Sequence, residues 1–241
     1  MEDLIIYNTI DSTNLEARRL LLDGPVRHGT ALLARAQTAG KGQFDRSWHT
    51  EPGDHLAMTL ILQPRHADVS LLPQVSMKIC LGIVRAIQET NPHIQPKIKW
   101  PNDIYVSGKK CCGILIENTI SGQMIQHIIA GIGMNINERQ FPSSLPNATS
   151  LLMVTGETYA IIEIARRIRI EVLRLLDDEE NNWRVEYDPL IFGLEMEHIF
   201  EKNGDDFKAV VQGVDDAGRI VLRTADGNTQ SYYSHEIKWK W

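Results

Sequence analysis

Apolar residues in the N-terminal half of the chain follow two spacings, which predict two kinds of element. Mostly apolar stretches at residues 4–8, 30–36 and 55–62 predict strands, because β-prone stretches of this length fit a buried sheet. Apolar residues three and four positions apart predict helices at residues 15–22 and 70–87. This half is therefore expected to combine strands and helices.

The second half of the chain changes from long elements to short ones. Apolar runs separated by turn residues over 97–133 predict an antiparallel meander. Helical spacing returns over residues 150–180 and again over residues 183–192. Short strands separated by Gly and Asp turns follow, which predicts a small β-barrel of about fifty residues. We therefore expect two domains, residues 1–190 and residues 191–241.

Composition and charge narrow the class of protein. The chain has 241 residues, of which 43% are hydrophobic and 23% charged, the usual balance of a soluble globular protein. The 25 Lys and Arg against 31 Asp and Glu give a formal net charge of -6. A negative net charge argues against a general surface for polyanions, so we do not expect nucleic acid as a partner.

Cysteine content and the first residues indicate a location. Three cysteines, with Cys111 next to Cys112, suit neither an ordinary disulfide framework nor a cysteine-only zinc site, and a reducing compartment fits best. The first seven residues carry acid where a signal peptide is basic and apolar, and no apolar run approaches the length of a membrane span. We expect a cytoplasmic protein with no membrane partner.

Hydroxyl residues at the predicted start of the first helix form one candidate site. Ser12 and Thr13 stand directly before the apolar spacing begins. Such residues most often cap a helix, and the alternative is that one hydroxyl faces a ligand. Ser70 is expected to cap the second helix in the same way.

A loop rich in glycine between the second and third strands forms another candidate. Gly40 and Gly42 allow close backbone approach, so successive N–H groups can point at an anion, while Lys41 and Arg46 add positive charge. An ordinary surface loop with Trp48 packed on the core fits the same pattern. The loop by itself does not distinguish an anion-binding site from an ordinary surface loop.

Two further candidates lie at turns of the predicted meander. Asn102 and Asp103 follow a strand break at Pro101, where Asp103 could be an oxygen ligand of Mg²⁺ or part of an Asx turn. Lys110 precedes a buried strand, where it could hold a phosphate or carboxylate or remain solvated. Each position is ambiguous by itself.

Several common catalytic motifs are absent from the sequence. There is no zinc-binding H-E-x-x-H and no nucleophile elbow G-x-S-x-G. Gly131 and Gly133 lack the third glycine of a dinucleotide fingerprint. A nucleotide site in this chain must therefore use other residues.

Taken in order and spacing, the candidate segments resemble the biotin protein ligases over nearly the whole chain. The most diagnostic is Lys99 to Tyr105, Lys-Trp-Pro-Asn-Asp-Ile-Tyr. The other matching segments are Asp11 to Asn14, Gln37 to Gly42 with Trp48, Lys110 to Glu117, and Gly131 to Asn135. The β-rich tail resembles the family's SH3-like C-terminal domain.

The resemblance implies a fold and a reaction. The fold would be α+β, a central mixed, mostly antiparallel sheet with helices on one side, of the class II synthetase-like type, plus the small SH3-like barrel. Biotin and Mg-ATP would give biotinyl-5'-AMP and pyrophosphate, and a lysine of a biotin carboxyl carrier protein would then take the biotin. We expect the monofunctional type, a monomer or homodimer without a DNA-binding domain, because the catalytic fold starts almost at Met1.

The resemblance also assigns roles to residues. The expected biotin-binding residues are Ser12, Thr13, Asn14, Gln37, Gly40, Lys41, Lys110 and Gly113. The expected ATP-binding residues are Gly42, Gln43, Trp48, Asn102 and Asn135, with Asp103 as the Mg²⁺ ligand. The expected catalytic residues are Lys110, Lys41 and Arg46. Lys110 would offset the negative charge that develops as the biotin carboxylate and the α-phosphate meet.

The glycine loop departs from the family pattern at two positions. Lys41 replaces an arginine, and Asp45 stands where a third glycine is expected. An ammonium is a point charge rather than a fork, so weaker retention of biotinyl-5'-AMP is expected. Two other functions stay open: lipoate or octanoate transfer, which the tryptophan-bearing loop disfavours, and a biotin or adenylate sensor without turnover.

Overall fold

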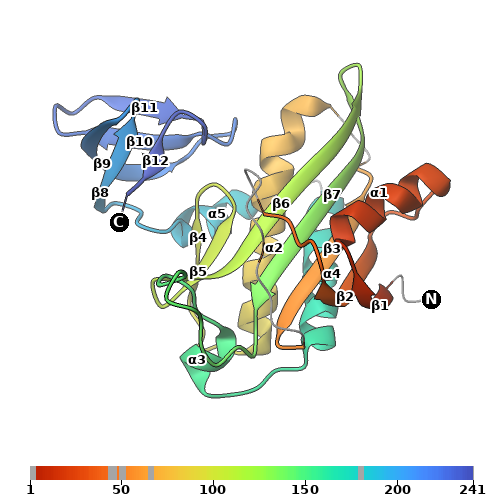
Figure 1. Ribbon diagram of the computed structural model, residues 1–241. Coiled ribbons are helices and arrows are strands. Elements are labelled where there is room, and N and C mark those ends of the chain that lie inside the picture. Colours follow the sequence, from red (N-terminus) through yellow and green to blue (C-terminus); the bar gives the residue numbers. More distant parts are fainter. Residues whose placement is uncertain (1–3, 43–47, 49–52, 65–67, 179–181, 241) are drawn as a thin grey trace.

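The long strands of the chain form one large sheet (Figure 1). The computed structural model describes residues 4–42, 48, 53–64, 68–178 and 182–240. The strands of the large sheet are β1 (Leu4–Ile10), β2 (Thr30–Gln37), β3 (His55–Leu62), β4 (Pro96–Lys99), β5 (Asp103–Val106), β6 (Lys109–Ser121) and β7 (Met124–Asn135). Their order is β1-β2-β3-β7-β6-β5-β4. Among the strands in the described residues, only β1 and β2 pair in parallel, which confirms the mixed, mostly antiparallel sheet and the meander.

The two faces of β7 carry different side chains, and this difference creates the site. Ala130, Ile132 and Met134 are buried in the main hydrophobic core. Gly131, Gly133 and Asn135 alternate with them, and successive side chains of a strand point to opposite faces. One face is therefore filled by bulky residues, whereas the other has no side chain at Gly131 and Gly133.

Helices cover both faces of the large sheet, not one face as expected. The long helices α2 (Leu72–Thr90) and α4 (Ile161–Asp177) pack together on the apolar face, so closely that a β-carbon at Gly82 would lie 2.7 Å from Cγ2 of Val172. Helix α1 (Thr13–Asp23) lies on the opposite face (Figure 1). It buries Ala17 against Leu32 of β2 and residues of β3 and β7. Helix α1 therefore lies on the same face of the large sheet as Gly131 and Gly133.

The start of α2 differs from the expectation. A 3-10 turn, Val69–Leu71, precedes the helix, and the Asp68 side chain accepts a hydrogen bond from the backbone N–H of Ser70. Ser70 is thus capped and is not the cap, because the carboxylate two residues earlier reaches the N–H first. By length and composition alone, Val69–Thr90 could also cross a membrane, although no run of that kind was expected. In its most apolar stretch, 56% of residues are buried inside the protein.

Short helices connect the large sheet to the C-terminal region. Helix α3 (Leu151–Thr155) ends at Gly156, which adopts the left-handed conformation that glycine tolerates. The helix expected over residues 183–192 is shorter: α5 spans Trp183–Tyr187, and a 3-10 turn, Asp188–Leu190, follows. Pro189 sits in the first turn of this last segment, where its missing N–H is no loss.

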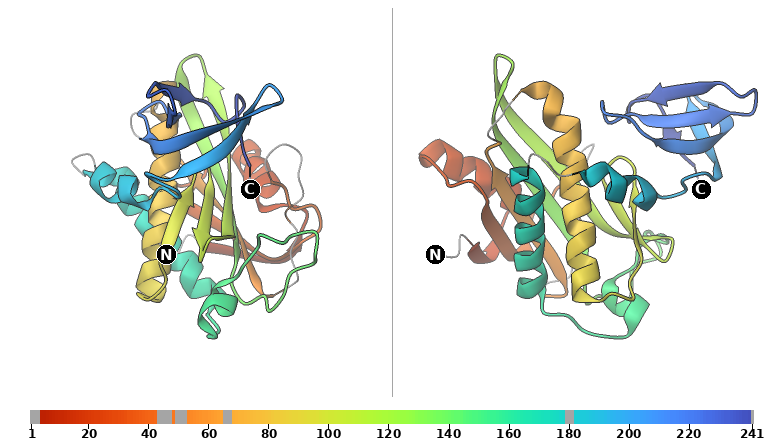
Figure 2. Two further views of the ribbon diagram at one scale, coloured as in Figure 1. Left: turned by 90° about the vertical axis from the view of Figure 1, so that its left-hand side faces the viewer. Right: turned by 180° about the vertical axis from the view of Figure 1, so that it is seen from behind.

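The C-terminal strands form a second, smaller antiparallel sheet. They are β8 (Glu197–Lys202), β9 (Asp205–Val214), β10 (Ile220–Thr224), β11 (Thr229–Tyr232) and β12 (Lys238–Trp239), in the order β11-β10-β9-β8-β12. In the part of the chain described, β11 and β12 are its two ends, so the sheet is barrel-like without a closing pair. Figure 2 shows it beside one end of the large sheet. The predicted boundary between residues 190 and 191 lies in the segment that joins the sheets.

Hydrogen bonds from the β4–β5 turn and from α5 attach the C-terminal region to the rest of the protein. The indole Nε1 of Trp100 donates to the carbonyl of Gly218 at 2.9 Å, and Nη2 of Arg184 donates to the carbonyl of Val214 at 2.6 Å. Trp100 belongs to the diagnostic sequence segment and is buried. The segment expected to bind phosphates is therefore held from the C-terminal side of the molecule.

Candidate active site

A cavity of about 490 Å³ opens on the face of the large sheet that carries α1. Most of the residues singled out in the sequence line it, although they come from distant segments. These are Ser12, Thr13, Asn14, Gln37, Lys41, Gly42, Trp48, Asn102, Asp103, Lys110, Gly113 and Asn135. Gly40 is not among the lining residues, and Gln43, Asp45 and Arg46 lie outside the described residues.

The floor of the cavity is a patch of glycine backbone. Gly113 of β6 and Gly133 of β7 are direct cross-strand partners. A β-carbon at Gly133 would lie 2.4 Å from Cε2 of Trp48, and one at Gly131 would lie 2.4 Å from Oδ1 of Asn14. Trp48 and Asn14 therefore rest directly on the sheet backbone, which only glycine permits at this distance.

Uncharged polar groups bond one another at the end of the cavity next to α1, and we call the cluster Thr13, Asn14, Gln37 and Thr59 the neutral end, although Lys41 also lines the cavity on this side. The backbone N–H of Thr13 donates to Oε1 of Gln37 at 2.8 Å. Oγ1 of Thr59, fully buried, lies 2.6 Å from Oδ1 of Asn14 and 2.8 Å from Oγ1 of Thr13. Ser12 occupies the N-cap position, but its side chain makes no capping hydrogen bond. The Ser12 side chain therefore lines the cavity and does not cap the helix.

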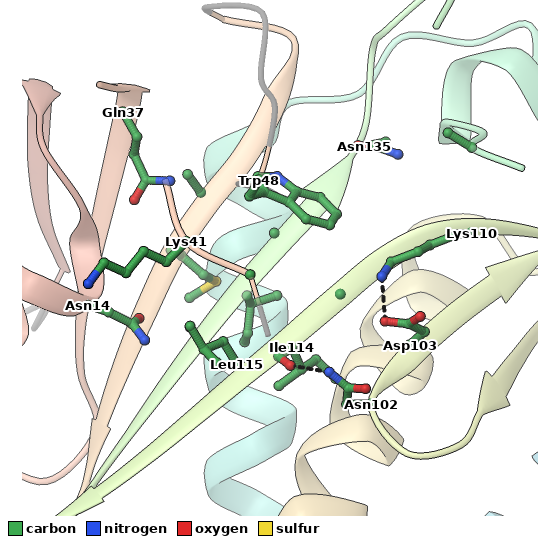
Figure 3. Close-up of a pocket in the computed structure, with 18 of the residues that line it drawn as sticks. Asn14, Gln37, Lys41, Trp48, Asn102, Asp103, Lys110, Ile114, Leu115 and Asn135 are labelled. Atoms are coloured by element: carbon green, nitrogen blue, oxygen red, sulfur yellow. Dashed lines mark hydrogen bonds and ion pairs between the residues drawn. The ribbon is translucent and has the colours of Figure 1, made fainter. Parts of the chain in front are cut away.

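The opposite end carries charge, and we call Lys99, Asp103 and Lys110 the charged end. Nζ of Lys110 lies 2.7 Å from Oδ1 of Asp103 (Figure 3). The turn between β4 and β5, which includes a cis peptide bond between Trp100 and Pro101, brings Lys99 opposite Asp103 as a cross-strand pair. All three side chains line the cavity.

Asn102 is locked at the tip of this turn. Its Nδ2 donates to the carbonyl of Ile114, and its own carbonyl accepts from the N–H of Ile114 at 3.0 Å (Figure 3). The second amide atom, Oδ1, is thereby turned away from β6. The position expected to meet phosphates is rigid because two bonds fasten it to the neighbouring strand.

A bulge in β6 explains how Lys110 reaches the cavity. Simple alternation would put Lys110 and Gly113 on opposite faces, since they are three residues apart. The β5–β6 register shifts between Ile104 and Tyr105, so the bulge restores both to one face. A β-carbon at Gly113 would lie 3.2 Å from Cε of Lys110. Cys111 and Cys112 are both fully buried beside the bulge.

Lys99 is enclosed by aromatic rings from both sheets. Its Nζ lies 5.7 Å from the ring centroid of Tyr105 and 5.1 Å from that of Trp239. Burial lowers the pKa of Lys99. Trp239 also lines the cavity, so the last strand of the chain contributes to the site. No local sequence pattern indicated this residue, because its position depends on how the two sheets meet.

The two lysines expected to be catalytic are far apart. Lys41 is exposed, and Figure 3 shows its amine on the side of the cavity near Asn14, whereas the Lys110 amine points to Asp103. The Trp48 ring lies between them, with Nζ of Lys110 at 5.7 Å from its centroid. In this structure only Lys110 belongs to the charged end.

Thr59 and Glu117 do not line the cavity, but both bond Asn14, which does, and neither was expected from the sequence. Thr59 is the one hydroxyl residue within β3, a strand buried along its whole length, and an isolated polar residue in such a strand was an available signal. Glu117 accepts a hydrogen bond from Nδ2 of Asn14 at 2.8 Å, across 103 positions of sequence. A contact between residues so far apart in the sequence cannot be predicted from a local pattern.

The arrangement suits a ligand with two different ends. Neutral donors and acceptors at one end can bind an uncharged polar ring, and two amines at the other can bind anions. Comparisons with known proteins show the family. Residues 7–135, more than half of the chain, match the model of the Biotin/lipoate A/B protein ligase family. The chain belongs to this family.

Other similarities extend over the rest of the chain. Residues 199–237 match the Biotin protein ligase C terminal domain. The chain is 31% identical to a biotin–[acetyl-CoA-carboxylase] ligase of Paracoccus denitrificans, over 90% of this chain and 92% of the relative. It is 30% identical to the bifunctional ligase/repressor BirA of Bacillus subtilis, over 97% of this chain and 73% of the relative.

Solved structures show the same fold. The biotin protein ligase from Aquifex aeolicus in complex with biotin and ATP has a TM-score of 0.79 and 25% sequence identity, covering 100% of this chain and 99% of that one. The biotin protein ligase fold expected from the sequence is thereby confirmed, including the small C-terminal sheet.

Proposed function

We propose that the chain is an ATP-dependent biotin protein ligase that forms biotinyl-5'-AMP and transfers biotin to a lysine of a biotin carboxyl carrier protein. The observation that carries the proposal is a single cavity with a neutral end and a charged end. Biotin has a neutral ureido ring and a carboxylate tail, so it matches both ends in one orientation. The Aquifex relative bound to biotin and ATP supports the choice of substrates.

Residue roles follow from this orientation. Ser12, Thr13 and Gln37 would bind the ureido ring, and Lys110 would meet the carboxylate above Gly113. Trp48, Asn102 and Asn135 would border the ATP site. The roles expected for Gly40, Gly42 and Lys41 remain part of the proposal, as do those of Gln43 and Arg46 outside the described residues.

The proposed chemistry has two steps. A carboxylate oxygen of biotin attacks the α-phosphorus of ATP, and the bond to pyrophosphate breaks. Lys110 can hold the two reacting anions together because its ammonium lies at the charged end, where it offsets their repulsion. The neutral amine of the carrier lysine then attacks the acyl carbon, AMP leaves, and a proton passes to solvent.

Mg²⁺ fits this site only together with ATP. Asp103 is the one carboxylate that lines the cavity, and the described residues contain no group of three potential metal ligands. Mg²⁺ typically takes one or two carboxylates together with substrate phosphates, which it would neutralise here. Asp103 and the Oδ1 atom of Asn102 are the oxygens on the protein side that could hold it.

The wider setting of the enzyme is also proposed. Three buried, free cysteines support a reducing, cytoplasmic location. The net charge of -6 supports a function without nucleic acid. The division at residues 190 and 191, and a monomeric or homodimeric state, complete the proposal.

The proposal is tested by two assays on the whole chain. We expect biotin-dependent exchange of labelled pyrophosphate into ATP, followed by transfer of labelled biotin to a biotin carboxyl carrier domain. Tight binding of biotin without either activity would indicate a sensor instead. Labelling by lipoate or octanoate, competing with biotin, would move the assignment to the related transferases.

A further inference from the structure

A line of polar side chains runs from the protein surface to the neutral end. Nη2 of Arg18, half-exposed on α1, donates to Oε1 of Glu117 at 2.6 Å. Oε2 of Glu117 accepts a hydrogen bond from Nδ2 of Asn14 at 2.8 Å. Oγ1 of Thr59 lies 2.6 Å from Oδ1 of Asn14 and 2.8 Å from Oγ1 of Thr13. Thr59 of β3 and Glu117 of β6 both flank β7, pairing with Gly131 and Ile129. We call Glu117, Asn14, Thr59 and Thr13 the relay, and Arg18 is the ion-pair partner of Glu117 at the surface.

Chemistry fixes the orientation of Asn14. An ionised carboxylate only accepts hydrogen bonds, so the Asn14 atom that faces Glu117 must be the donor Nδ2. Oδ1 then faces Thr59, and it rests on Gly131, where a β-carbon would lie 2.4 Å away. Glu117 thus decides which end of the amide points into the protein.

The orientation of Asn14 in turn fixes two hydroxyl protons. An amide oxygen only accepts, so the single proton of Thr59 goes to Asn14. The 2.8 Å contact between Thr59 and Thr13 then needs the Thr13 proton, which is drawn away from Oε1 of Gln37, 3.2 Å from the same hydroxyl oxygen, and the Thr13 oxygen is left as an acceptor at the cavity. The orientation of Gln37 is set by the backbone N–H of Thr13, which requires Oε1 as its acceptor, so Nε2 of Gln37 remains a donor.

We propose that Glu117 is a positioning residue that sets the hydrogen-bond polarity of the neutral end, so that it presents an acceptor at Thr13 and a donor at Gln37. This inference rests on the proposed function. A ureido ring offers a carbonyl acceptor beside N–H donors, which is the complement of that pair. Without Glu117, Asn14 can turn its amide, Thr59 can donate its proton to Thr13, and the Thr13 proton can turn to Oε1 of Gln37, so the Thr13 oxygen already accepts one hydrogen bond and is a weaker acceptor for the ligand.

The test is a set of biotin dissociation constants measured by calorimetry. Glu117→Met keeps length and volume but removes the acceptor, and we expect biotin to bind about tenfold more weakly, the usual effect of one lost hydrogen bond. The KM for ATP stays unchanged, because ATP binds away from the relay. Glu117→Gln keeps an oxygen for Asn14 and restores the affinity. Arg18→Ala, the surface control, leaves it unchanged.

A double variant separates positioning from general damage. Thr59→Val cuts the relay in the middle, so Glu117→Met should add nothing to the loss that Thr59→Val causes, whereas independent effects would add. Thr59→Ser, which keeps the hydroxyl, should bind biotin normally. If Glu117→Met does not fold, the Val and Ser variants at position 59 carry the test.

The outcomes distinguish two failures. A wild-type chain that binds no biotin overturns the proposed function together with the relay. A wild-type chain that binds biotin, with Glu117→Met binding equally well or Thr59→Ser as weakly as Thr59→Val, overturns the relay alone.

Discussion

The two ends of the cavity are built on different physical principles. At the neutral end, amide and hydroxyl groups already bond one another and are almost completely buried, as with Thr13, Asn14 and Thr59. At the charged end, Lys110 and Asp103 form an ion pair whose side chains are 35% and 17% exposed. One end is organised before a ligand arrives, and the other holds charges that still face solvent.

This difference implies a division of work. Fully bonded polar networks are rigid, so the neutral end selects a ligand by its pattern of donors and acceptors. The ammonium of Lys110 must exchange its carboxylate partner, wholly or in part, for ligand anions. We therefore expect substitutions at the neutral end to change biotin affinity and substitutions at the charged end to change the rate of reaction.

The largest expected effect comes from Lys110→Ala. Loss of a group that stabilises charge in the transition state typically slows a reaction on the order of 10²- to 10³-fold, so pyrophosphate exchange should fall by that factor. Biotin affinity should change much less, because the neutral end is intact. Lys109→Ala removes a neighbouring exposed lysine and is the matched control. Equal loss in both variants would contradict a specific role for Lys110.

A smaller effect, confined to affinity, is expected for Gly131→Ala. The new β-carbon would lie 2.4 Å from Oδ1 of Asn14, so Asn14 must move, and biotin should bind roughly tenfold more weakly through the loss of one or more hydrogen bonds. Gly82→Ala is the control, because it overpacks Val172 on the far face of the sheet. Gly82→Ala should lower the melting temperature, as Gly131→Ala should, but it should leave the biotin dissociation constant unchanged.

The smallest effect on activity is expected at Glu138, which belongs to neither end. This carboxyl is 6% exposed, and burial raises its pKa to about 7. The folded state therefore holds a proton between about pH 4.5 and 7 that the unfolded state releases, so stability falls as the pH rises through this window.

Glu138→Gln removes this dependence, since the amide does not titrate. At about pH 8 the variant should be more stable than the wild type by on the order of 1 to 3 kcal/mol, and the difference should shrink toward pH 5. Denaturant unfolding at several pH values measures it. A wild-type curve that does not fall between pH 5 and 8 would contradict the burial argument.

Much of the fold could be predicted from local patterns. The apolar stretches predicted β2 and β3, and the turn residues predicted the meander from β4 to β7. These features depend on spacing and on residue conformations that act within a few positions. Two expectations that were wrong, Ser70 as a cap and a long helix after Trp183, concern ends of elements. A third, helices on one face of the sheet, concerns packing between distant segments.

The sequence by itself determined which segments form the site, because motifs such as Lys99 to Tyr105 are contiguous and chemically distinctive. Only the tertiary structure decided how their side chains meet. The bulge that turns Lys110 toward Gly113, the tryptophan from β12 beside Lys99, and Glu117 behind Asn14 all depend on register and on contacts between distant segments. Such contacts are set by packing of the whole sheet, so no local pattern encodes them.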